Sequence, residues 1–259
     1  MAAIFFDIDG TLWDKENRIP DSTKEAIRLL RKNGHLTFIC SGRTRVFINS
    51  EELLSMGFDG ILCGCGTHIE YQGENLLYRR IDDELLKKSV QMFYDYDMPM
   101  VMEGRHMLYM DPEIISRDGY GRYLLDAAKD YTMPIRDNQE HWEASKFSVL
   151  IGGKKYREVM EKLSDDYDFL VHGEFVMEVI PKGFSKATAI AVICEKLGID
   201  RKDTYAFGDS ANDVDMLDYA GTGVAMGNGT DLAKSHADYV TDSLHEDGIY
   251  NALKHFSLI

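Results

Sequence analysis

The sequence predicts an α/β fold, in which a Rossmann-like parallel sheet with helices on its faces is interrupted by a smaller α+β domain. Short apolar runs alternate with helical patterns over residues 1–81 and again over 184–259. Such alternation is typical of parallel sheets, because each parallel strand pair needs a crossover connection. Residues 82–183 instead carry two hairpin patterns with helices of their own, and about 100 residues suffice for a small domain. We therefore expect a core built from both ends of the chain and a cap inserted between them.

Apolar periodicity defines the elements of the first core segment. We expect a strand at 3–6, a helix at 20–34, a strand at 35–40, a helix at 44–57 and a strand at 60–63. Ser22 and Glu25 have the spacing of a capping box for the first helix, and Gly34 is placed to end it.

The insert and the last core segment follow in the same way. In the insert we expect a helix at 82–97, a hairpin formed by 98–103 and 106–111, a helix near 114–128, a strand at 146–152, a helix near 154–164 and a hairpin over 168–180 that turns near Gly173. The first hairpin is rich in methionine, which favours a place in the cap core over a substrate slot. In the last segment we expect helices at 185–199, 212–221 and 230–237 and strands at 204–207, 223–226 and 238–240.

Charge and composition exclude several classes of partner. The formal net charge is −15, whereas nucleic acids and anionic membranes are bound by basic surfaces. No run of about 18 apolar residues appears, so we expect no membrane span. The N-terminal apolar stretch is too short and too acidic for a signal peptide, so a cytoplasmic protein with reduced thiols is expected. Cys63-Gly64-Cys65 has no second Cys/His cluster with zinc spacing, which argues against a metal role there.

Three predicted strands end in polar residues. Asp7, Ser41 and Asp209 each follow an apolar run and precede a small, glycine-bearing loop. Because ligands of open parallel sheets bind outside the carboxyl ends of the strands, we expect these side chains to meet at one site. The helix expected after Ser41 would add its N-terminus as a binding site for an anion.

Asp7 and Asp9 lie two residues apart and would repel each other. Two like charges at ~4 Å with an effective dielectric constant of ~20 cost about 4 kcal/mol. The pair therefore indicates a bound cation, a shared proton or a loop open enough to make the crowding harmless.

Four segments in order resemble the motifs of the haloacid dehalogenase-like phosphatases: DIDGTL, CSGR, KGFSKATAI and GDSANDVDML. The insert between the second and third motifs, which ends in EVIPKGFSK, is similar to the large α/β cap of the Cof-type subfamily, IIB. The trailing AMGNGTDLAKSHADYVTDSLHEDGI is similar to the C-terminal signature of that subfamily. The resemblance covers essentially the whole chain.

The resemblance implies a role for each motif residue. Asp7 would be the nucleophile that forms an aspartyl-phosphate, and Asp9 the general acid and base. The residues expected to bind the phosphate group or the substrate are Thr11, Ser41, Gly42, Lys186 and Asn212. The expected ligands of Mg²⁺ are Asp7, the backbone carbonyl of Asp9, Asp209 and Asp213, which offer the oxygen atoms that this ion prefers.

The chain also departs from the family pattern. Gly64–Thr67 replaces the usual Ser-Asn-Gly-Ala, so a substrate contact made by that asparagine is in doubt, and Ala187 replaces a common glycine beside Lys186. Arg43 is a candidate either to bind phosphate or to form a salt bridge. Glu178 is a candidate either to face the substrate or to lie on a solvent-exposed strand face.

The expected function is Mg²⁺-dependent hydrolysis of small phosphorylated metabolites, such as sugar phosphates, through an aspartyl-phosphate. A phosphomutase that uses the same aspartate pair is one alternative. A non-enzymatic phospho-accepting module is the other, although such a module needs neither a cap nor Asp9.

Overall fold

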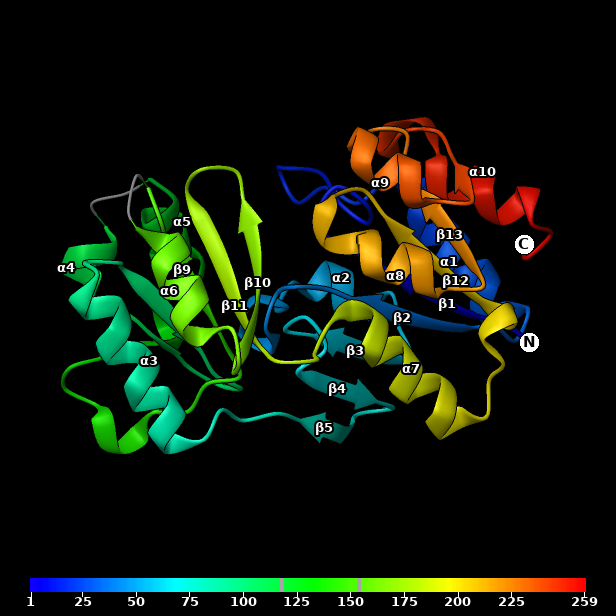
Figure 1. Ribbon diagram of the computed structural model, residues 1–259. Helices are drawn as coiled ribbons and strands as arrows, with labels where there is room; N and C mark the ends of the chain where they lie inside the picture. The colour runs from blue at the N-terminus through cyan, green and yellow to red at the C-terminus, as the bar shows by residue number, and fades with distance from the viewer. Residues whose placement is uncertain (117–118, 153–154) are drawn as a thin grey trace. The chain divides into compact units, whose positions relative to one another are not determined.

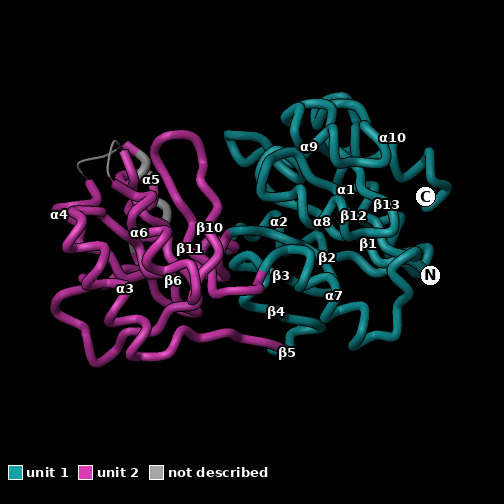
Figure 2. Tube along the Cα trace, in the orientation of Figure 1, with its two compact units in different colours: residues 1–42, 49–76, 185–259 teal, residues 43–48, 77–184 magenta. Residues whose placement is uncertain are grey.

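The computed structural model describes residues 1–116, 119–152 and 155–259, and it divides into two compact units (Figure 2). The first unit comprises residues 1–42, 49–76 and 185–259, and the second comprises residues 43–48 and 77–184. The segment expected as an insert, 82–183, lies inside the longer part of the second unit.

The first unit is built on a sheet whose strands come from both ends of the chain (Figure 1). The strands of this sheet are β1 (Ala3–Phe6), β2 (Leu36–Cys40), β3 (Gly60–Cys63), β4 (His68–Tyr71), β5 (Glu74–Tyr78), β12 (Thr204–Gly208), β13 (Thr222–Ala225) and β14 (Tyr239–Val240), and the last two residues of β5 fall in the second unit. Within the described residues this sheet has eight strands in the order β14-β13-β12-β1-β2-β3-β4-β5. All neighbours from β14 to β3 pair in parallel, which confirms the predicted fold class.

Helices cover both faces of this sheet (Figure 1). They are α1 (Asp21–Lys32), α2 (Glu51–Ser55), α7 (Lys186–Leu197), α8 (Val214–Tyr219), α9 (Asp231–His236) and α10 (Gly248–His255). α7, α8 and α9 pack along one face, and α1 packs with α10 on the other. Short 3-10 helices in the same unit are η4 (Arg201–Asp203), η5 (Ala211–Asp213) and η6 (Leu244–Glu246).

The centre of the first unit is aromatic. Phe5 stacks on Phe38 with ring centroids 4.9 Å apart, and Phe6 stacks on Phe207 at 5.0 Å. All four rings are fully buried. Because large buried rings dominate core energetics, these contacts hold β1 between its two neighbours, β2 and β12.

Two local expectations in the first unit are wrong. Helix α1 has Pro20 at its N-cap and no side-chain cap, because it begins at Asp21 and so places Ser22 inside its first turn; Glu25 pairs with Arg28. The helix expected at 44–57 is two short pieces, η1 (Arg45–Phe47), which belongs to the second unit, and α2. The residue before α2, Ser50, caps it by accepting a hydrogen bond from the Leu53 amide. After Ser41 the chain forms the three-residue 3-10 helix η1 in place of the expected α-helix N-terminus.

Strands β4 and β5 and helix α10 were not predicted. β4 pairs antiparallel with β3 across the four residues Gly64–Thr67. A connection this short cannot form the crossover that parallel strands need.

The second unit is an antiparallel sheet with helices of its own. Its strands are β6 (Met100–Glu103), β7 (Leu108–Tyr109), β8 (Thr132–Met133), β9 (Lys146–Leu150), β10 (Tyr167–His172) and β11 (Val176–Pro181). Within the described residues the strand order is β10-β11-β9-β6-β7-β8, and only the β7–β8 pair is parallel. Its helices are α3 (Asp83–Asp95), α4 (Pro112–Ile115), α5 (Gly119–Ala127), α6 (Tyr156–Leu163), η2 (Lys129–Tyr131) and η3 (Gln139–His141). The predicted helices near 114–128 and 154–164 each include residues that lie outside the described ones (117, 118 and 154).

One face of this second sheet packs on α3 and α6. Phe147 and Val149 of β9 meet Phe93 of α3 and Val159 of α6 in one buried cluster. The methionines of the β6–β7 hairpin pack in this cluster or in a neighbouring one, which confirms their place in the core of the unit.

No described helix has the length and apolar character that crossing a membrane requires.

Candidate active site

The candidate site lies where the chain reverses its direction of travel across the first sheet. From β1 the chain proceeds to β2 on one side, and the late strand β12 lies on the other side of β1. Such a switch point is where open α/β sheets bind their ligands. Asp7 directly follows β1, and its amide donates a hydrogen bond of 2.9 Å to the carbonyl of Phe207 in β12. The sheet therefore brings Asp7 beside Asp209, as the strand ends predicted.

Three carboxylates gather there around one lysine. Asp7, Asp209 and Asp213 each offer an oxygen within 4.8 Å of the others. Lys186 Nζ lies 2.7 Å from Asp7 Oδ1 and 2.5 Å from Asp213 Oδ1. Asp7, Asp213 and Lys186 are all at most 3% exposed. These four side chains form what we call the acidic cluster.

The start of helix α7 positions Lys186. Lys186 is its first residue, after Ser185, whose hydroxyl accepts from the Thr188 amide in a capping box. A cation at a helix N-terminus is unfavourable for the helix dipole, so the two carboxylates that it contacts must offset that cost. Asp215 accepts a hydrogen bond of 3.1 Å from the Ala187 amide and ties the start of α7 to α8.

The loop after β12 shapes the other side of the cluster. Asp213 Oδ2 accepts from the amides of Asp209 and Ser210 at 2.9 and 3.0 Å, while its Oδ1 accepts from Lys186. Asp213 therefore caps a turn and belongs to the acidic cluster at once. Gly208 permits this approach, because a Cβ there would come within 2.5 Å of Asp213 Cβ.

Burial and mutual repulsion shift the proton affinities of the cluster. Burial raises the pKa of Asp7 well above its usual value; Lys186 opposes this, and the neighbouring aspartates add to it. Burial, together with Asp213, raises the pKa of Asp209 to about 7. Burial alone would lower the pKa of Lys186, but the carboxylates of Asp213 and Asp7 raise it well above its usual value. Lys186 is therefore charged, but its single positive charge does not neutralise the three carboxylates around it.

The acidic cluster fits a divalent cation bound by oxygen. Three ionised carboxylates and one ammonium sum to a formal charge of −2, which one divalent ion would neutralise. Asp209 Oδ1 is buried and has no hydrogen-bond partner among the described residues. Gly10 has φ +82°, and a Cβ there would lie 2.4 Å from Asp209 Oδ2, so the glycine leaves room beside this carboxylate. Carboxylate oxygens are the donors that hard cations such as Mg²⁺ select.

The remaining expected residues lie on the loops around the cluster. Asp9 is exposed, and the indole Nε1 of Trp13 donates a hydrogen bond of 2.9 Å to its Oδ1. Thr11 is buried, and its hydroxyl has no hydrogen-bond partner within the described part of the chain. Ser41 and Gly42 are buried directly after β2. Asn212 lies next to Asp213 in η5, where its side-chain oxygen accepts from the Ser210 hydroxyl at 2.7 Å.

The loop that departs from the family pattern links two of these elements. The Cys65 amide donates to the carbonyl of Ser41 at 3.2 Å. A Cβ on Gly66 would lie 2.2 Å from the carbonyl oxygen of Ser185. Gly64, Cys65 and Gly66 have positive φ values of 60°, 53° and 87°. The loop therefore joins the end of β2 to the start of α7 through its backbone, whatever side chain position 65 carries.

Sequence reasoning missed two residues that hold the loop after β1. Trp13, described above, contacts Asp9. Asn228 donates to the carbonyl of Gly10 at 2.8 Å and accepts from the Leu244 amide at 2.8 Å. No pattern in the sequence pairs either residue with its partner: Trp13 lies four residues after Asp9, and Asn228 lies more than 200 positions after Gly10.

The sequence left the roles of Arg43 and Glu178 undecided, and both residues lie in the second unit. Glu178 lies on β11, with its carboxylate 3.2 Å from the ammonium group of Lys146 and 3.6 Å from the imidazole of His172. Lys146 and Glu103 are 1% and 2% exposed and 3.8 Å apart, and Glu103 also accepts from the Thr44 hydroxyl at 2.9 Å. Arg43 belongs to the same unit and is half-buried.

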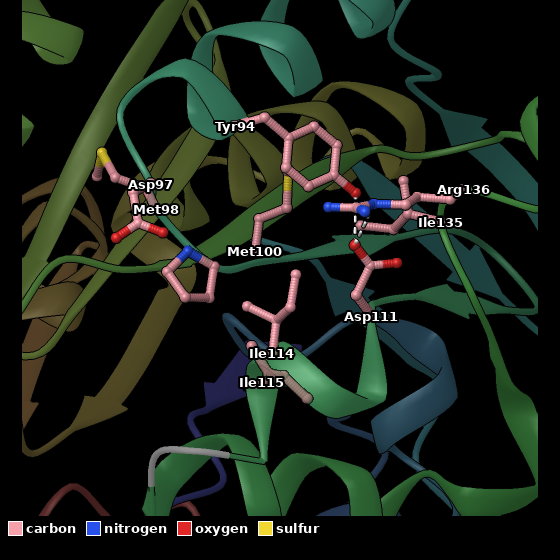
Figure 3. Close-up of a pocket in the computed structure, with 10 residues that line it drawn as sticks. Tyr94, Asp97, Met98, Met100, Asp111, Ile114, Ile115, Ile135 and Arg136 are labelled. Carbon is pink, nitrogen blue, oxygen red and sulfur yellow. Dashed lines mark hydrogen bonds and ion pairs between the residues drawn. The ribbon is translucent and has the colours of Figure 1, made fainter.

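A cavity of about 200 Å³ in the second unit contains none of the expected residues (Figure 3). The polar side chains that line it bind one another: Asp111 accepts a hydrogen bond of 2.7 Å from the Tyr94 hydroxyl and forms an ion pair of 3.4 Å with Arg136. Burial raises the pKa of Tyr94 to about 12, with Asp111 adding to the effect. This arrangement resembles a packing feature more than a reactive centre.

Comparison with known proteins points to one family. A profile of the haloacid dehalogenase-like hydrolases matches residues 4–253. YkrA of Bacillus subtilis is 30% identical over 99% of this chain and 98% of its own. The 5-amino-6-(5-phospho-D-ribitylamino)uracil phosphatase YcsE of the same organism is 31% identical over 98% of this chain and 95% of its own. Among solved structures, the HAD subclass IIB sugar phosphatase BT4131 matches with a TM-score of 0.86 and 29% identity, covering 100% of both chains.

Proposed function

Since the chain belongs to the haloacid dehalogenase-like hydrolases, as a phosphatase of subclass IIB, we propose that it hydrolyses small phosphomonoesters with Mg²⁺ through an aspartyl-phosphate at Asp7. The acidic cluster supports this proposal most directly. It combines a buried carboxylate at the switch point of the sheet, a buried ammonium group in contact with it, and two further carboxylates that need a cation.

The first half of the reaction transfers the phosphoryl group to the protein. An oxygen of Asp7 attacks phosphorus, and the bond between phosphorus and the leaving oxygen breaks. Asp9 gives its proton to that oxygen, so the product leaves as an alcohol. Lys186 holds Asp7 in place and offsets the charge of the incoming phosphate.

The second half regenerates the enzyme. Asp9, now a carboxylate, takes a proton from water as the water oxygen attacks phosphorus. The bond between phosphorus and Asp7 breaks, inorganic phosphate leaves, and Asp7 is again a carboxylate. Thr11, Ser41, Gly42 and Asn212 are proposed to bind the phosphate oxygens, which fits the Thr11 hydroxyl, since it has no hydrogen-bond partner among the described residues.

Asp7, Asp209, Asp213 and the Asp9 carbonyl would hold Mg²⁺. When bound, the ion supplies positive charge that offsets the charge of the phosphoryl group and its neighbouring carboxylates. A strongly acidic protein can in this way receive an anionic substrate through local compensation alone.

For the substrate we propose phosphorylated sugars or polyols. BT4131 is a sugar phosphatase, and YcsE acts on a phosphate ester of a ribityl chain, as their names state. We further propose that the second unit serves as the cap that selects the leaving group, and that the enzyme works in the cytoplasm. Four free, buried cysteines are consistent with a reducing compartment.

Phosphate release from a panel of sugar and polyol phosphates tests this function. The wild type should turn over many times with Mg²⁺, and activity should vanish with a chelator and in Asp7→Asn. Interconversion of phosphate positions without release would indicate a mutase instead. Release that persists in Asp7→Asn would contradict the proposed nucleophile.

A further inference from the structure

We infer that Trp13 is a positioning residue that fixes the Asp9 carboxyl group so that one particular oxygen, Oδ2, delivers the proton to the leaving group. This inference rests on the proposed role of Asp9 as general acid. It starts from the hydrogen bond of 2.9 Å that the Trp13 indole donates to Asp9 Oδ1.

The backbone holds the indole rigidly against Asp9. The Gly10 amide donates to the Trp13 carbonyl at 2.9 Å, and the Trp13 amide donates to the Ile8 carbonyl at 3.1 Å. Asp9 and Trp13 also form an isolated β-bridge. The Trp13 side chain is only 3% exposed, so its N–H group has one available direction. Asp9 is itself exposed, and the indole hydrogen bond fixes the position of its Oδ1 atom.

The chemistry of indole then distinguishes the two oxygens of Asp9. An indole nitrogen donates a hydrogen bond and cannot accept one. In a protonated carboxyl group the carbonyl oxygen is a stronger acceptor than the hydroxyl oxygen, so the indole N–H group favours Oδ1 as the carbonyl oxygen and Oδ2 as the oxygen that carries the proton. In the transfer step the bond between Oδ2 and hydrogen breaks as the bond between hydrogen and the leaving oxygen forms. The electron pair of the broken phosphorus–oxygen bond stays on that leaving oxygen.

This role predicts a dependence on the leaving group. An alkoxide needs a proton in order to leave, whereas p-nitrophenolate leaves readily without one. General acid catalysis typically contributes 10²–10⁴-fold, and a small misplacement of a catalytic group costs up to about 10²-fold. Trp13→Phe keeps an aromatic ring and removes the N–H group. We expect it to lower kcat/KM for the best alkyl phosphate by roughly 10- to 100-fold and for p-nitrophenyl phosphate by less than about 3-fold.

Two controls separate this inference from the proposed function. Asp9→Asn should show the same selective loss, and more strongly. Trp142→Phe removes another buried indole donor, which in the second unit bonds the Ile135 carbonyl at 2.9 Å, and should leave the ratio of the two activities unchanged. Equal losses on both substrates in Trp13→Phe, with a selective loss in Asp9→Asn, would overturn the role of Trp13 alone. Equal losses in Asp9→Asn would overturn the role of Asp9 as well.

A measurement on the intact indole covers the case in which Trp13→Phe does not fold. The chain has two tryptophans, so Trp13 gives the one indole N–H resonance in a Trp142→Phe background. We expect this resonance to move upfield in Asp9→Ala, because the hydrogen bond to the carboxylate is lost. An unchanged resonance would contradict the inference.

Discussion

Lys186 provides the only positive charge within the acidic cluster of Asp7, Asp209, Asp213 and Lys186. It is 2% exposed and contacts two buried carboxylates. Breaking a buried ion pair by removing one partner typically costs 3–5 kcal/mol, because the other charge is left uncompensated. We therefore expect Lys186→Met to lower the thermal midpoint by roughly 10 °C and kcat by at least ~10²-fold.

The matched control is Lys202→Met, since Lys202 pairs with Asp200 on the surface, where both side chains are more than 70% exposed. Thermal unfolding of this variant should match the wild type. A Lys186→Met protein as stable as the control would contradict the account of the cluster.

Asp209 should make the stability of the metal-free protein decrease as pH rises. Its pKa is raised to about 7, whereas an aspartate in an unfolded chain titrates near 4. Between these values the folded state holds a proton that the unfolded state has released, so the free energy of unfolding falls as pH rises from about 4 to about 7. In chelator-treated protein, Asp209→Asn should therefore raise the thermal midpoint at pH 8 and do so progressively less toward pH 5.

The exposed Asp200 offers the comparison for this experiment, because Asp200→Asn should not change the midpoint at either pH. If Asp209→Asn lowered the thermal midpoint equally at pH 8 and pH 5, the ionised Asp209 carboxylate would not be unfavourable in the folded protein.

At the scale of elements, the loop between β3 and β4 carries a sharp steric requirement. Gly66 has φ +87°, and a Cβ there would lie 2.2 Å from the Ser185 carbonyl oxygen. Gly198, which ends α7 at φ +64°, has open space around its missing Cβ. Replacing either by alanine incurs the cost of a left-handed backbone, about 1 kcal/mol, but only Gly66→Ala must also displace the start of α7.

We expect Gly66→Ala to destabilise the protein by roughly 1–3 kcal/mol more than Gly198→Ala, and to reduce activity because Lys186 begins that helix. Denaturant unfolding of the two variants measures the difference. Equal destabilisation would show that the loop does not position α7.

The strand ends explain why much of the site could be predicted from the sequence. Asp7 and Asp209 follow strands with strongly apolar patterns, and parallel strands place their carboxyl ends at one edge. The helix expected at 44–57 was wrong, since its apolar spacing fits two short helical pieces equally well. Strand β4 was missed because its turn places Cys65, a residue with no preference for positive φ, between two glycines. Helix α10 had a usable signal, with Ile249, Ala252 and Leu253 all buried on one face.

Contacts that depend on backbone geometry were beyond sequence reasoning. The Trp13 indole reaches Asp9 only because the intervening residues close a hydrogen-bonded turn. The same holds for Asn228, which contacts Gly10 across more than 200 positions of the chain. No periodicity encodes such pairs.

At the scale of the whole molecule, the strong negative charge and the phosphatase activity are compatible. The formal net charge is −15, so long-range electrostatics repel an anionic substrate. We therefore propose that affinity for phosphate arises from the buried lysine, the loop amides and a cation bound at the switch point of the sheet. The account as a whole depends on phosphate passing through one residue there, Asp7.

Trapping the covalent intermediate tests that central claim most directly. In Asp9→Asn with Mg²⁺ and p-nitrophenyl phosphate, Asp7 should be phosphorylated without help from an acid, while hydrolysis of the acyl phosphate lacks its base. Rapid acid quenching, borohydride reduction and peptide mass spectrometry should then find Asp7 converted to homoserine, in a yield that rises with the burst of p-nitrophenolate. A burst with Asp7 unmodified, or with the modification at another residue, would contradict the account.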